Sequence, residues 1–386
     1  MKYNFDKSIN RYNTNCVKWD EMESDDIIPM WVADMDFETA PCVIDALKAR
    51  MEHGCFGYTF VPESYYESVI SWFSRRHGWS MSRESFIYTS GVVPAISAII
   101  KAMTVPGDKV LIQTPVYNCF FSSIRNNGCE LAENELVNTD NRYTIDFEDF
   151  EKKCADEKVK VFILCNPHNP AGRVWTKEEL QRMGDICKKH GVFVIADEIH
   201  CEFTNHCQYV PFATASDATC AVCISPSKAF NIAGLQIANI ITEDEEIRSK
   251  VDKAININEV CDVNPFGVIA LQAAYNEGEE WLDQLNEYIY ANYNASRTYI
   301  EEHCPQLKVT TLEGTYLMWV NIRGTGLTTK EVCDTLLSEG RVYVNAGTMY
   351  GEKAGEGYIR VNLATSRDRV MEGIKRICTT INNVRH

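Results

Sequence analysis

Short apolar runs alternate with amphipathic helical patterns through the middle of the chain, and this alternation restricts the fold more than any other feature. The apolar runs at residues 109–113, 159–164 and 191–196 each end in polar, glycine or proline residues. Between the last two runs, Thr176 is placed to cap an amphipathic helix. Buried strands separated by helices require right-handed crossovers and a parallel sheet covered on both faces. The sequence therefore predicts an α/β fold with a mostly parallel central sheet.

The last hundred residues have a different texture. They show a long helix, a strand, a helix, a second strand and a closing helix, at residues 279–304, 315–322, 328–339, 357–363 and 366–381. This pattern predicts a smaller α+β domain, which we expect the N-terminal residues to complete. We therefore divide the chain into a large domain, residues 46–284, and a small domain, residues 1–45 together with 285–386.

Charge and composition exclude several classes of protein. The 386 residues include 38 basic and 54 acidic side chains, which give a formal net charge of −16. A dedicated nucleic-acid-binding protein needs a basic face, so this balance argues against nucleic acid as a partner. The first residues lack the apolar core of a signal peptide, and no apolar run approaches the length of a membrane span. We therefore expect a cytoplasmic protein that does not contact a membrane.

The cysteines do not suggest a metal site. There are 16 of them spread along the chain, which is typical of free thiols in a reducing compartment. Cys201 and Cys207 have His200 and His206 beside them, which superficially resembles a set of metal ligands. Their spacing fits no standard zinc pattern, so we expect no metal.

A single lysine stands between two serines and an apolar run in residues 225–235, with strand-like residues on both sides. Burial removes hydration from a lysine amine, which lowers its pKa and makes it a usable nucleophile. We therefore interpret Lys228 as the attachment point of pyridoxal phosphate, and Ser225 and Ser227 as donors to its phosphate group. A Ser-x-Ser-Lys string also occurs in solvated loops, so this interpretation depends on further contacts elsewhere in the chain.

Polar residues after the apolar runs are the further candidates, because ligands of parallel sheets gather at the carboxyl ends of the strands. Asp197 could hold a pyridine nitrogen protonated, although a strand-end aspartate commonly serves only as a cap or turn residue. Three residues later, His200 could hydrogen-bond the phenolic oxygen of the cofactor, or could be packed in the core. Tyr117 could stack on a planar ring, or could be a buried core tyrosine.

Two anion-binding candidates and one neutral donor complete the set. The stretch around Gly91, Val92 and Val93 reads as a turn entering a helix, whose first N–H groups would bind a phosphate without a basic side chain. Asn169 lies between prolines and could bind a ring oxygen or a substrate carboxylate. Arg360 lies in an otherwise apolar strand and needs an anion, either a substrate carboxylate or the partner in a structural salt bridge.

These elements, in this order, resemble the fold-type I pyridoxal phosphate enzymes of the class I/II aminotransferase family over nearly the whole chain. Within that family the chain looks most similar to the MalY/PatB-type lyases, the group of cystathionine β-lyases and cystalysin that acts on cysteine S-conjugates. The strings that carry the resemblance are Trp-Val-Ala-Asp-Met-Asp-Phe at 31–37, Gly-Tyr-Thr at 57–59, Thr-Ser-Gly-Val-Val-Pro-Ala at 89–95, Pro-His-Asn-Pro-Ala-Gly-Arg-Val-Trp at 167–175, Asp-Glu-Ile-His at 197–200, the Lys228 segment, and Glu-Gly-Thr-Tyr-Leu at 313–317.

The resemblance implies an aspartate-aminotransferase-like fold and a role for each matching residue. Lys228 would hold the cofactor and move the Cα proton, with Tyr117 and Asp197 completing the catalytic set. The cofactor-binding residues that it implies are Gly91, Val92, Val93, Tyr117, Asn169, Asp197, His200, Ser225, Ser227, Lys228 and Tyr58. The substrate-binding residues that it implies are Arg360, Asn169, Ala33 and Tyr58. Because Tyr58 would reach the cofactor of a neighbouring subunit, a homodimer is implied.

The implied reaction is α,β-elimination of L-cystathionine, L-cystine or a related L-cysteine S-conjugate to a thiol, pyruvate and ammonia. Aminotransferases commonly have an arginine where this chain has Gln236, and a tyrosine where it has His200. Both departures look like the lyase group. One alternative is an amino-acid aminotransferase, which differs in where the carbanion is reprotonated. The other is a regulatory binding protein that keeps the fold.

Overall fold

The computed structural model describes residues 2–259 and 263–384 and is built around a seven-stranded sheet. The strands in order across this sheet are β2 (Phe86–Thr89), β10 (Ala238–Ile241), β9 (Cys220–Ile224), β8 (Phe193–Asp197), β7 (Val159–Cys165), β3 (Lys109–Thr114) and β4 (Glu130–Glu135). Strand β10 runs antiparallel to β2 and β9, whereas the pairs from β9 to β4 are parallel. The predicted α/β fold with a mostly parallel sheet is confirmed.

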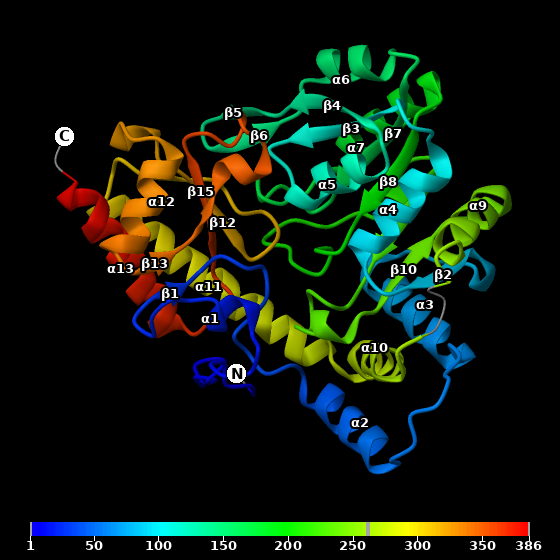
Figure 1. The fold of residues 1–386 in the computed structure, drawn as a ribbon, viewed down its shortest axis with the longest axis horizontal. Coiled ribbons are helices and arrows are strands. Elements are labelled where there is room, and N and C mark those ends of the chain that lie inside the picture. The colour runs from blue at the N-terminus through cyan, green and yellow to red at the C-terminus, as the bar shows by residue number, and fades with distance from the viewer. Residues whose placement is uncertain (1, 260–262, 385–386) are drawn as a thin grey trace.

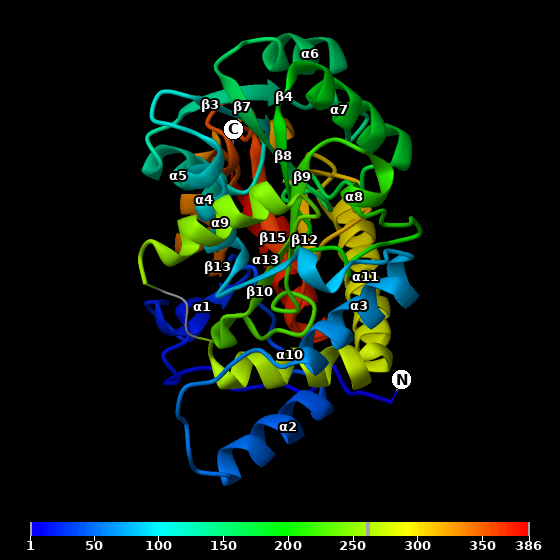
Figure 2. The same ribbon diagram turned by 90° about the vertical axis from the view of Figure 1, so that its right-hand side faces the viewer.

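Helices cover both faces of the sheet (Figure 1). The helices that share an apolar core with one face are α4 (Val92–Met103), α5 (Asn118–Asn126) and α9 (Glu245–Asn256). The helices on the other face are α3 (Glu63–His77), α6 (Phe147–Cys154), α7 (Lys177–His190), α8 (Phe212–Ala215) and α10 (Pro265–Glu277). Helix α2 (Pro41–Glu52) packs on α10 at the edge of the molecule (Figure 2). Thr176 caps helix α7 in a capping box, in which its side chain accepts from the backbone N–H of Glu179, so that prediction is confirmed.

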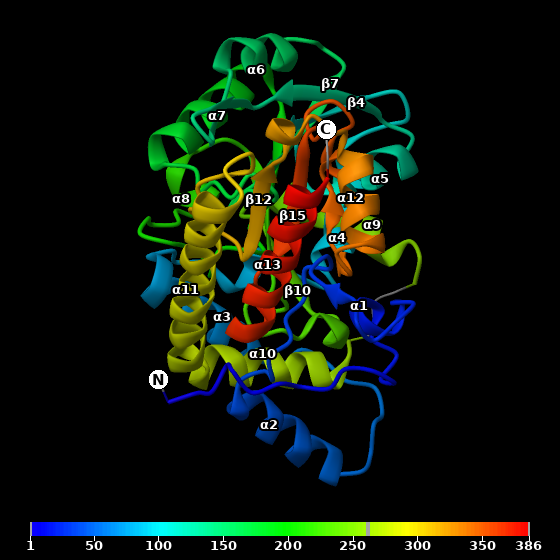
Figure 3. The same cartoon turned by 90° about the vertical axis from the view of Figure 1, so that its left-hand side faces the viewer.

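A second, antiparallel sheet is formed mainly by the last hundred residues. Its strands in order are β11 (Lys308–Val309), β12 (Leu317–Asn321), β15 (Tyr358–Asn362) and β14 (Asn345–Ala346). The helices that pack in this part are α11 (Glu279–His303), α12 (Thr329–Ser338) and α13 (Arg367–Asn383), as Figure 3 shows. The predicted strands and helices of this part are confirmed, with bounds within about two residues of the expected ones.

The N-terminal residues join this second part through two short strands. Strand β1 (Ile28–Pro29) pairs in parallel with β13 (Val342–Tyr343), and Met30 packs in the core beneath the small sheet. Short helix α1 (Val17–Asp20) precedes β1, and a small hairpin, β5 (Val137–Thr139) with β6 (Arg142–Thr144), lies between β4 and β7 in the chain. The division into domains at residues 45/46 and 284/285 stays a prediction, because α11 runs through the second boundary without a break. Among the described residues, no helix combines the length and the apolar character needed to cross a bilayer.

Candidate active site

A cavity of about 390 Å³ lies where the parallel strands of the main sheet end. Asp197 is the last residue of β8, and Lys228 lies four residues beyond the end of β9. The predicted site residues that line the cavity are Ala33, Gly91, Val92, Val93, Tyr117, Asn169, Asp197, His200, Ser227, Lys228 and Arg360. The structure therefore brings together all of the predicted site residues except Ser225 and Tyr58.

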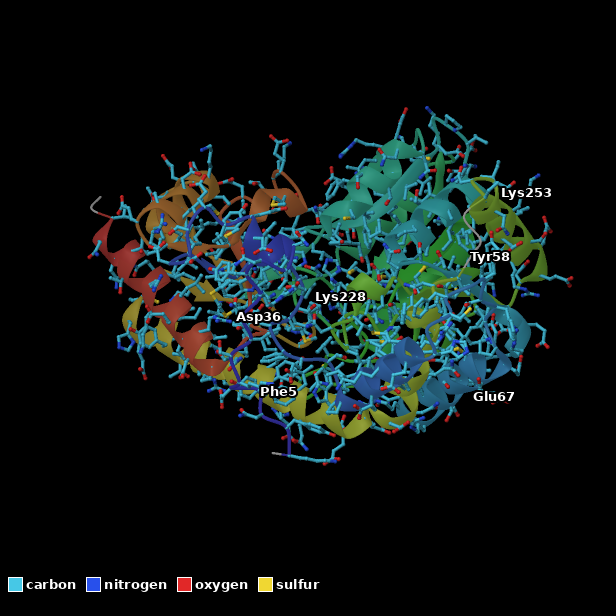
Figure 4. All side chains as sticks on the ribbon, turned by 60° about the horizontal axis from the view of Figure 1, so that its bottom comes forward. Phe5, Asp36, Tyr58, Glu67, Lys228 and Lys253 are labelled. Carbon is cyan, nitrogen blue, oxygen red and sulfur yellow. The ribbon has the colours of Figure 1, made fainter. Side chains whose placement is uncertain are left out.

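Lys228 is a half-buried residue that lines this cavity, and it lies near the middle of the molecule in the view of Figure 4. Burial lowers the pKa of Lys228 to about 8, and the nearby guanidinium of Arg360 acts in the same direction. The Nζ atom donates a hydrogen bond to the carbonyl oxygen of Ala33 at 2.6 Å. A lysine with this pKa is neutral in a substantial fraction of molecules near physiological pH, which a nucleophile or a base requires.

Asp197 and His200 are buried on neighbouring turns at the end of β8. Burial raises the pKa of Asp197 to about 7, against which the backbone N–H of Ile199 donates to Oδ1 at 3.2 Å. Burial also lowers the pKa of His200 well below its usual value, with Lys228 and Arg360 adding to the effect. Among the described residues, His200 Nδ1 has no hydrogen-bond partner. A nearby cation would therefore stabilise the ionised form of Asp197, and a ligand atom could supply the hydrogen bond that His200 Nδ1 lacks among the described residues.

Tyr117 follows β3 and presents its ring to the cavity from the start of α5. Its ring packs edge-on against Phe120 at 5.8 Å between centroids. Burial, and then the Cys119 thiol, raise the pKa of the Tyr117 phenol, so that it stays protonated at neutral pH. A planar ligand could stack here, and the phenol could give a proton.

Arg360 extends from β15 of the small sheet into the cavity of the main sheet. Its NH2 group donates to the carbonyl oxygen of Trp31 at 2.8 Å, and NH1 donates to Asn169 Oδ1 at 3.2 Å. The guanidinium lies 4.8 Å from the centroid of the Tyr350 ring. Its Nε is buried without a partner, and no carboxylate forms an ion pair with it within residues 2–259 and 263–384. The structural salt bridge weighed as an alternative is absent from this region, which leaves Arg360 in need of an anionic ligand.

Backbone N–H groups at the start of a helix face one end of the cavity and are suited to bind an anion. Gly91 is the N-cap residue of α4, and Val92 and Val93 make its first turn. The Ser227 hydroxyl lines the same cavity. Ser225 does not line it, because its hydroxyl lies under the loop, where it donates to the carbonyl oxygen of Ile237 at 2.6 Å. We expect Ser225 to act on a phosphate only through Ser227, whose N–H donates to Ser225 Oγ at 3.0 Å.

Tyr58 lies far from the cavity of its own chain, on the loop that connects α2 to α3 (Figure 4). The side chain is 97% exposed, and Phe56 and Phe60 beside it are also exposed. A contact between Tyr58 and a cofactor in this chain is therefore excluded. The role across a subunit interface stays a prediction.

The structure does not assemble the His and Cys residues weighed as metal ligands. His200 faces the cavity, whereas the Cys207 thiol contacts the carbonyl oxygen of Glu313 at 3.2 Å. In the part of the chain that the structure describes, His77, Cys201 and Glu202 do lie close enough to share an ion. Glu202 is already bound there by Trp72 Nε1 at 2.7 Å and by the cation Arg76 at 3.2 Å, which leaves little reason for a metal.

One cysteine pair with metal-like spacing, Cys220-Ala-Val-Cys223, lies within strand β9. Residues three apart in a strand point to opposite faces of the sheet. Accordingly Cys223 packs in the core on one face and Cys220 against the core on the other. The pair therefore cannot share a ligand or form a disulfide.

Several cavity residues were not predicted from the sequence. They include Trp31, Asn118, Cys119, Asn345, Met349 and Tyr350. Asn118 and Cys119 directly follow Tyr117, so their position after the end of β3 was the signal that could have found them. Met349 and Tyr350 lie in a short 3₁₀ helix at Gly347–Tyr350, for which no comparable signal exists.

Comparison with known proteins agrees with this geometry. The model of the family described as "Aminotransferase class I and II" matches residues 25–377. Cystathionine beta-lyase PatB of Bacillus subtilis (strain 168) is 41% identical over 383 residues, which cover 97% of this chain and 98% of PatB. The crystal structure of cystalysin from Treponema denticola, which contains a pyridoxal 5'-phosphate cofactor, covers 100% of both chains with a TM-score of 0.95 and 33% identity. The PLP-bound C-S lyase from Staphylococcus hominis also covers 100% of both chains, with a TM-score of 0.92 and 35% identity. This chain therefore belongs to the class I and II aminotransferase family.

Proposed function

We propose that the protein is a pyridoxal 5'-phosphate-dependent C–S β-lyase. Its reaction is the α,β-elimination of L-cystathionine, L-cystine or a related L-cysteine S-conjugate to a thiol, pyruvate and ammonia. The observation that carries the proposal is the convergence on one cavity of three ionisable groups: the half-buried Lys228 and the buried Asp197 and Arg360. The names of PatB, cystalysin and the staphylococcal C–S lyase support the choice of elimination over other reactions of the family.

The residues of the cavity fit pyridoxal 5'-phosphate. A protonated pyridine nitrogen would compensate the charge of Asp197, whose burial raises its pKa to about 7. The ring oxygen would give His200 Nδ1 the partner that it lacks among the described residues. The first turn of α4 and the Ser227 hydroxyl suit a phosphate, and Lys228 supplies the amine for covalent attachment.

Side chains of the cavity bind the substrate and move its protons. When bound, pyridoxal 5'-phosphate supplies the electron sink for negative charge at the substrate Cα. Arg360 binds the substrate α-carboxylate, which fixes the direction of the Cα–H bond. Lys228 Nζ accepts the Cα proton, and the carbonyl oxygen of Ala33 lies 2.6 Å away to receive the resulting N–H. The leaving thiolate takes a proton from Lys228 or from the phenol of Tyr117, which burial keeps protonated.

The proposal includes a homodimer in which Tyr58 completes the partner's site. The support on this chain is the loop between α2 and α3, which presents Phe56, Tyr58 and Phe60 to solvent. A complementation experiment tests it. Tyr58→Ala subunits and Lys228→Ala subunits are each expected to be nearly inactive as homodimers, whereas mixing them should regenerate one intact site in each hybrid. Failure to recover activity, in mixtures shown to contain hybrids, would exclude the shared site.

The test of the reaction is incubation of the purified holoenzyme with L-cystathionine and no keto acid. We expect pyruvate and free thiol to appear in equal amounts, and Lys228→Ala to abolish both. Lys253→Ala, which removes an exposed lysine on α9 (Figure 4), is the matched control and should keep full activity. Transfer of an amino group to an added keto acid, without release of thiol, would instead establish an aminotransferase.

A further inference from the structure

The segment 31–37 carries two carbonyl groups that hold the reactive cations of the cavity. This segment joins β1 to α2 and forms no helix or strand. The carbonyl oxygen of Trp31 accepts from Arg360 at 2.8 Å, and that of Ala33 accepts from Lys228 at 2.6 Å. The buried phenol of Tyr316 donates to the same Ala33 oxygen at 2.9 Å. The position of this backbone therefore decides where both side chains point.

On its other side, the segment is held by a cluster of charges from the N-terminal residues. We call Arg11, Lys18, Asp34 and Asp36 the strap cluster. Arg11 is ion-paired with Asp34 at 2.6 Å and with Asp36 at 2.9 Å. Lys18 lies 3.1 Å from Asp36 and 3.7 Å from Asp34. The Lys18 and Asp36 side chains are each only 1% exposed, and Trp19 Nε1 donates to Asp36 at 2.8 Å.

Holding a loop in place does not require buried charges. The desolvation of ionised groups is costly, and well-packed apolar residues often stabilise a fold equally well. Asp36 is nevertheless kept ionised, since Lys18, Trp19 and Arg11 lower its pKa against the opposing effect of burial. Asp34 differs from Asp36 in two respects: its side chain is 22% exposed, and among the described residues its buried Oδ1 accepts no hydrogen bond. Asp34 therefore has a charge that its own neighbours satisfy only in part.

The electrostatic surroundings of Lys228 include that charge. Arg360 from β15 disfavours a proton on Lys228, as does burial, whereas three acidic groups on other elements favour it. The charged and titratable groups that face Lys228 are Arg360 on β15, Asp34 on the segment 31–37, Asp197 at the end of β8, Cys119 on α5 and His200 after β8. Asp34 is thus an acidic group near Lys228 that lies on a different segment from the expected cofactor partner, Asp197.

We propose that Asp34 is a positioning residue for the lysine of the active site: held by Arg11, it fixes the Ala33 carbonyl against Lys228 Nζ and supplies negative charge that favours a proton on that nitrogen. This inference rests on the proposed attachment of pyridoxal 5'-phosphate to Lys228. It concerns the resting holoenzyme and not the elimination step.

The visible absorbance of the resting holoenzyme, titrated with pH in the absence of substrate, tests the inference. The protonated and neutral forms of the lysine–cofactor linkage absorb differently, so the titration gives the midpoint of that nitrogen. In Asp34→Asn the midpoint should fall by on the order of one pH unit, because an opposite charge nearby has been removed. In Arg11→Met it should rise, because the charge of Asp34 is then less compensated.

Opposite shifts in the two variants separate electrostatic positioning from a general loosening of the fold, which would move both midpoints in one direction. Asp26→Asn is the matched control: Asp26 is an exposed carboxylate paired with Arg341 at 2.8 Å, and its loss should leave the midpoint unchanged. A midpoint unchanged within about 0.2 unit in both strap variants, with lowered melting temperatures, would overturn the inference. If Asp34→Asn does not fold, the rise in Arg11→Met alone decides, and its absence refutes the proposal. Because no substrate is added, an enzyme that binds cofactor but eliminates no thiol would still test the inference.

Discussion

Asp197→Asn should stabilise the cofactor-free protein and weaken cofactor binding, with a defined dependence on pH. Burial raises the pKa of Asp197 from 3.8 to about 7. Below pH 3.8 the carboxyl is protonated in both the folded and the unfolded chain, and it costs nothing. Between these two pKa values the unfolded chain loses the proton while the folded chain keeps it, so the free energy of unfolding falls as the pH rises. Above pH 7 the free energy of unfolding falls no further on account of Asp197, because the carboxyl is then ionised in both states.

The magnitude follows from the size of the shift. At 1.36 kcal/mol per pKa unit, a shift of about three units costs about 4 kcal/mol above pH 7 and about 1.6 kcal/mol at pH 5. Asparagine removes this cost, so the variant's advantage should grow by about 2–3 kcal/mol between pH 5 and pH 8. For a chain of 386 residues, 4 kcal/mol corresponds to a rise of about 5 °C in melting temperature. Glu198, whose pKa burial raises to about 8, gives both proteins a slope of the same sign, which cancels in the difference except for the smaller part that the charge of Asp197 adds to that pKa.

The assay is denaturant unfolding of the cofactor-free proteins at pH 5 and pH 8, repeated with pyridoxal 5'-phosphate. With cofactor bound, Asp197→Asn should be less stable than the unsubstituted protein rather than more stable. The protonated pyridine nitrogen compensates a carboxylate but not an amide. The affinity should then fall by on the order of a hundredfold, as expected when one partner of a buried charge pair is removed. Asp217→Asn, at an exposed carboxylate paired with Lys188, should show no such reversal. A variant whose advantage does not change between pH 5 and pH 8 would refute the reasoning.

Three further substitutions test other parts of the structure. Arg360→Lys should lower kcat/KM on the order of a hundredfold, mainly through KM, because the lysine cannot form two parallel bonds to a carboxylate; steady-state kinetics decides, and a loss below threefold would count against carboxylate binding. Arg173→Met should lower the free energy of unfolding by about 3–5 kcal/mol, because Glu313 and Glu179, at 2.7 and 2.9 Å, lose a fully buried partner; an unchanged denaturant midpoint would contradict this. Gly355→Ala should lower the melting temperature, since its Cβ would overlap the carbonyl oxygen of Gly347, whereas Gly234→Ala, with no neighbouring atom within 4 Å, should not; equal melting temperatures would show that the chain relaxes around residue 355.

The elements of the fold that repeat a simple pattern could be predicted from the sequence. The apolar runs that became β3, β7 and β8, and the helices that became α7, α11, α12 and α13, all have clear periodicity or capping residues. Helix α10 was missed because it is apolar on several sides and so has no stripe, although Asn264 and Pro265 mark its start: Asn264 caps it by accepting from Phe266 N. The antiparallel direction of β10 in the main sheet could not be predicted either, because its pairing with β2 depends on tertiary contacts and not on local sequence.

The chemistry of the site was predictable where residues follow strands, and not where they come from irregular backbone. Asp197 and Lys228 could be found because strand ends of a parallel sheet converge. The strap cluster could not, because Arg11 and Lys18 lie in a polar N-terminal stretch of the kind that is usually solvated. Its burial depends on the packing of residues 31–37 between both sheets. Similarly, nothing in the sequence distinguishes Ser227, which lines the cavity, from Ser225, which lies beneath it.

Helix α11 packs against both sheets and restricts their movement relative to each other. Its first half, with Trp281, Leu285 and Tyr288, packs in the core of the main sheet, and its second half, with Tyr293 and Ile300, packs in the core of the small one. A helix of 25 residues is a stiff rod of nearly 40 Å, so the small sheet, which carries Arg360, cannot tilt freely about a flexible linker. Amide protons along both halves should consequently exchange with solvent in a single cooperative opening. A substitution that disrupts either core should also make Arg360 more mobile.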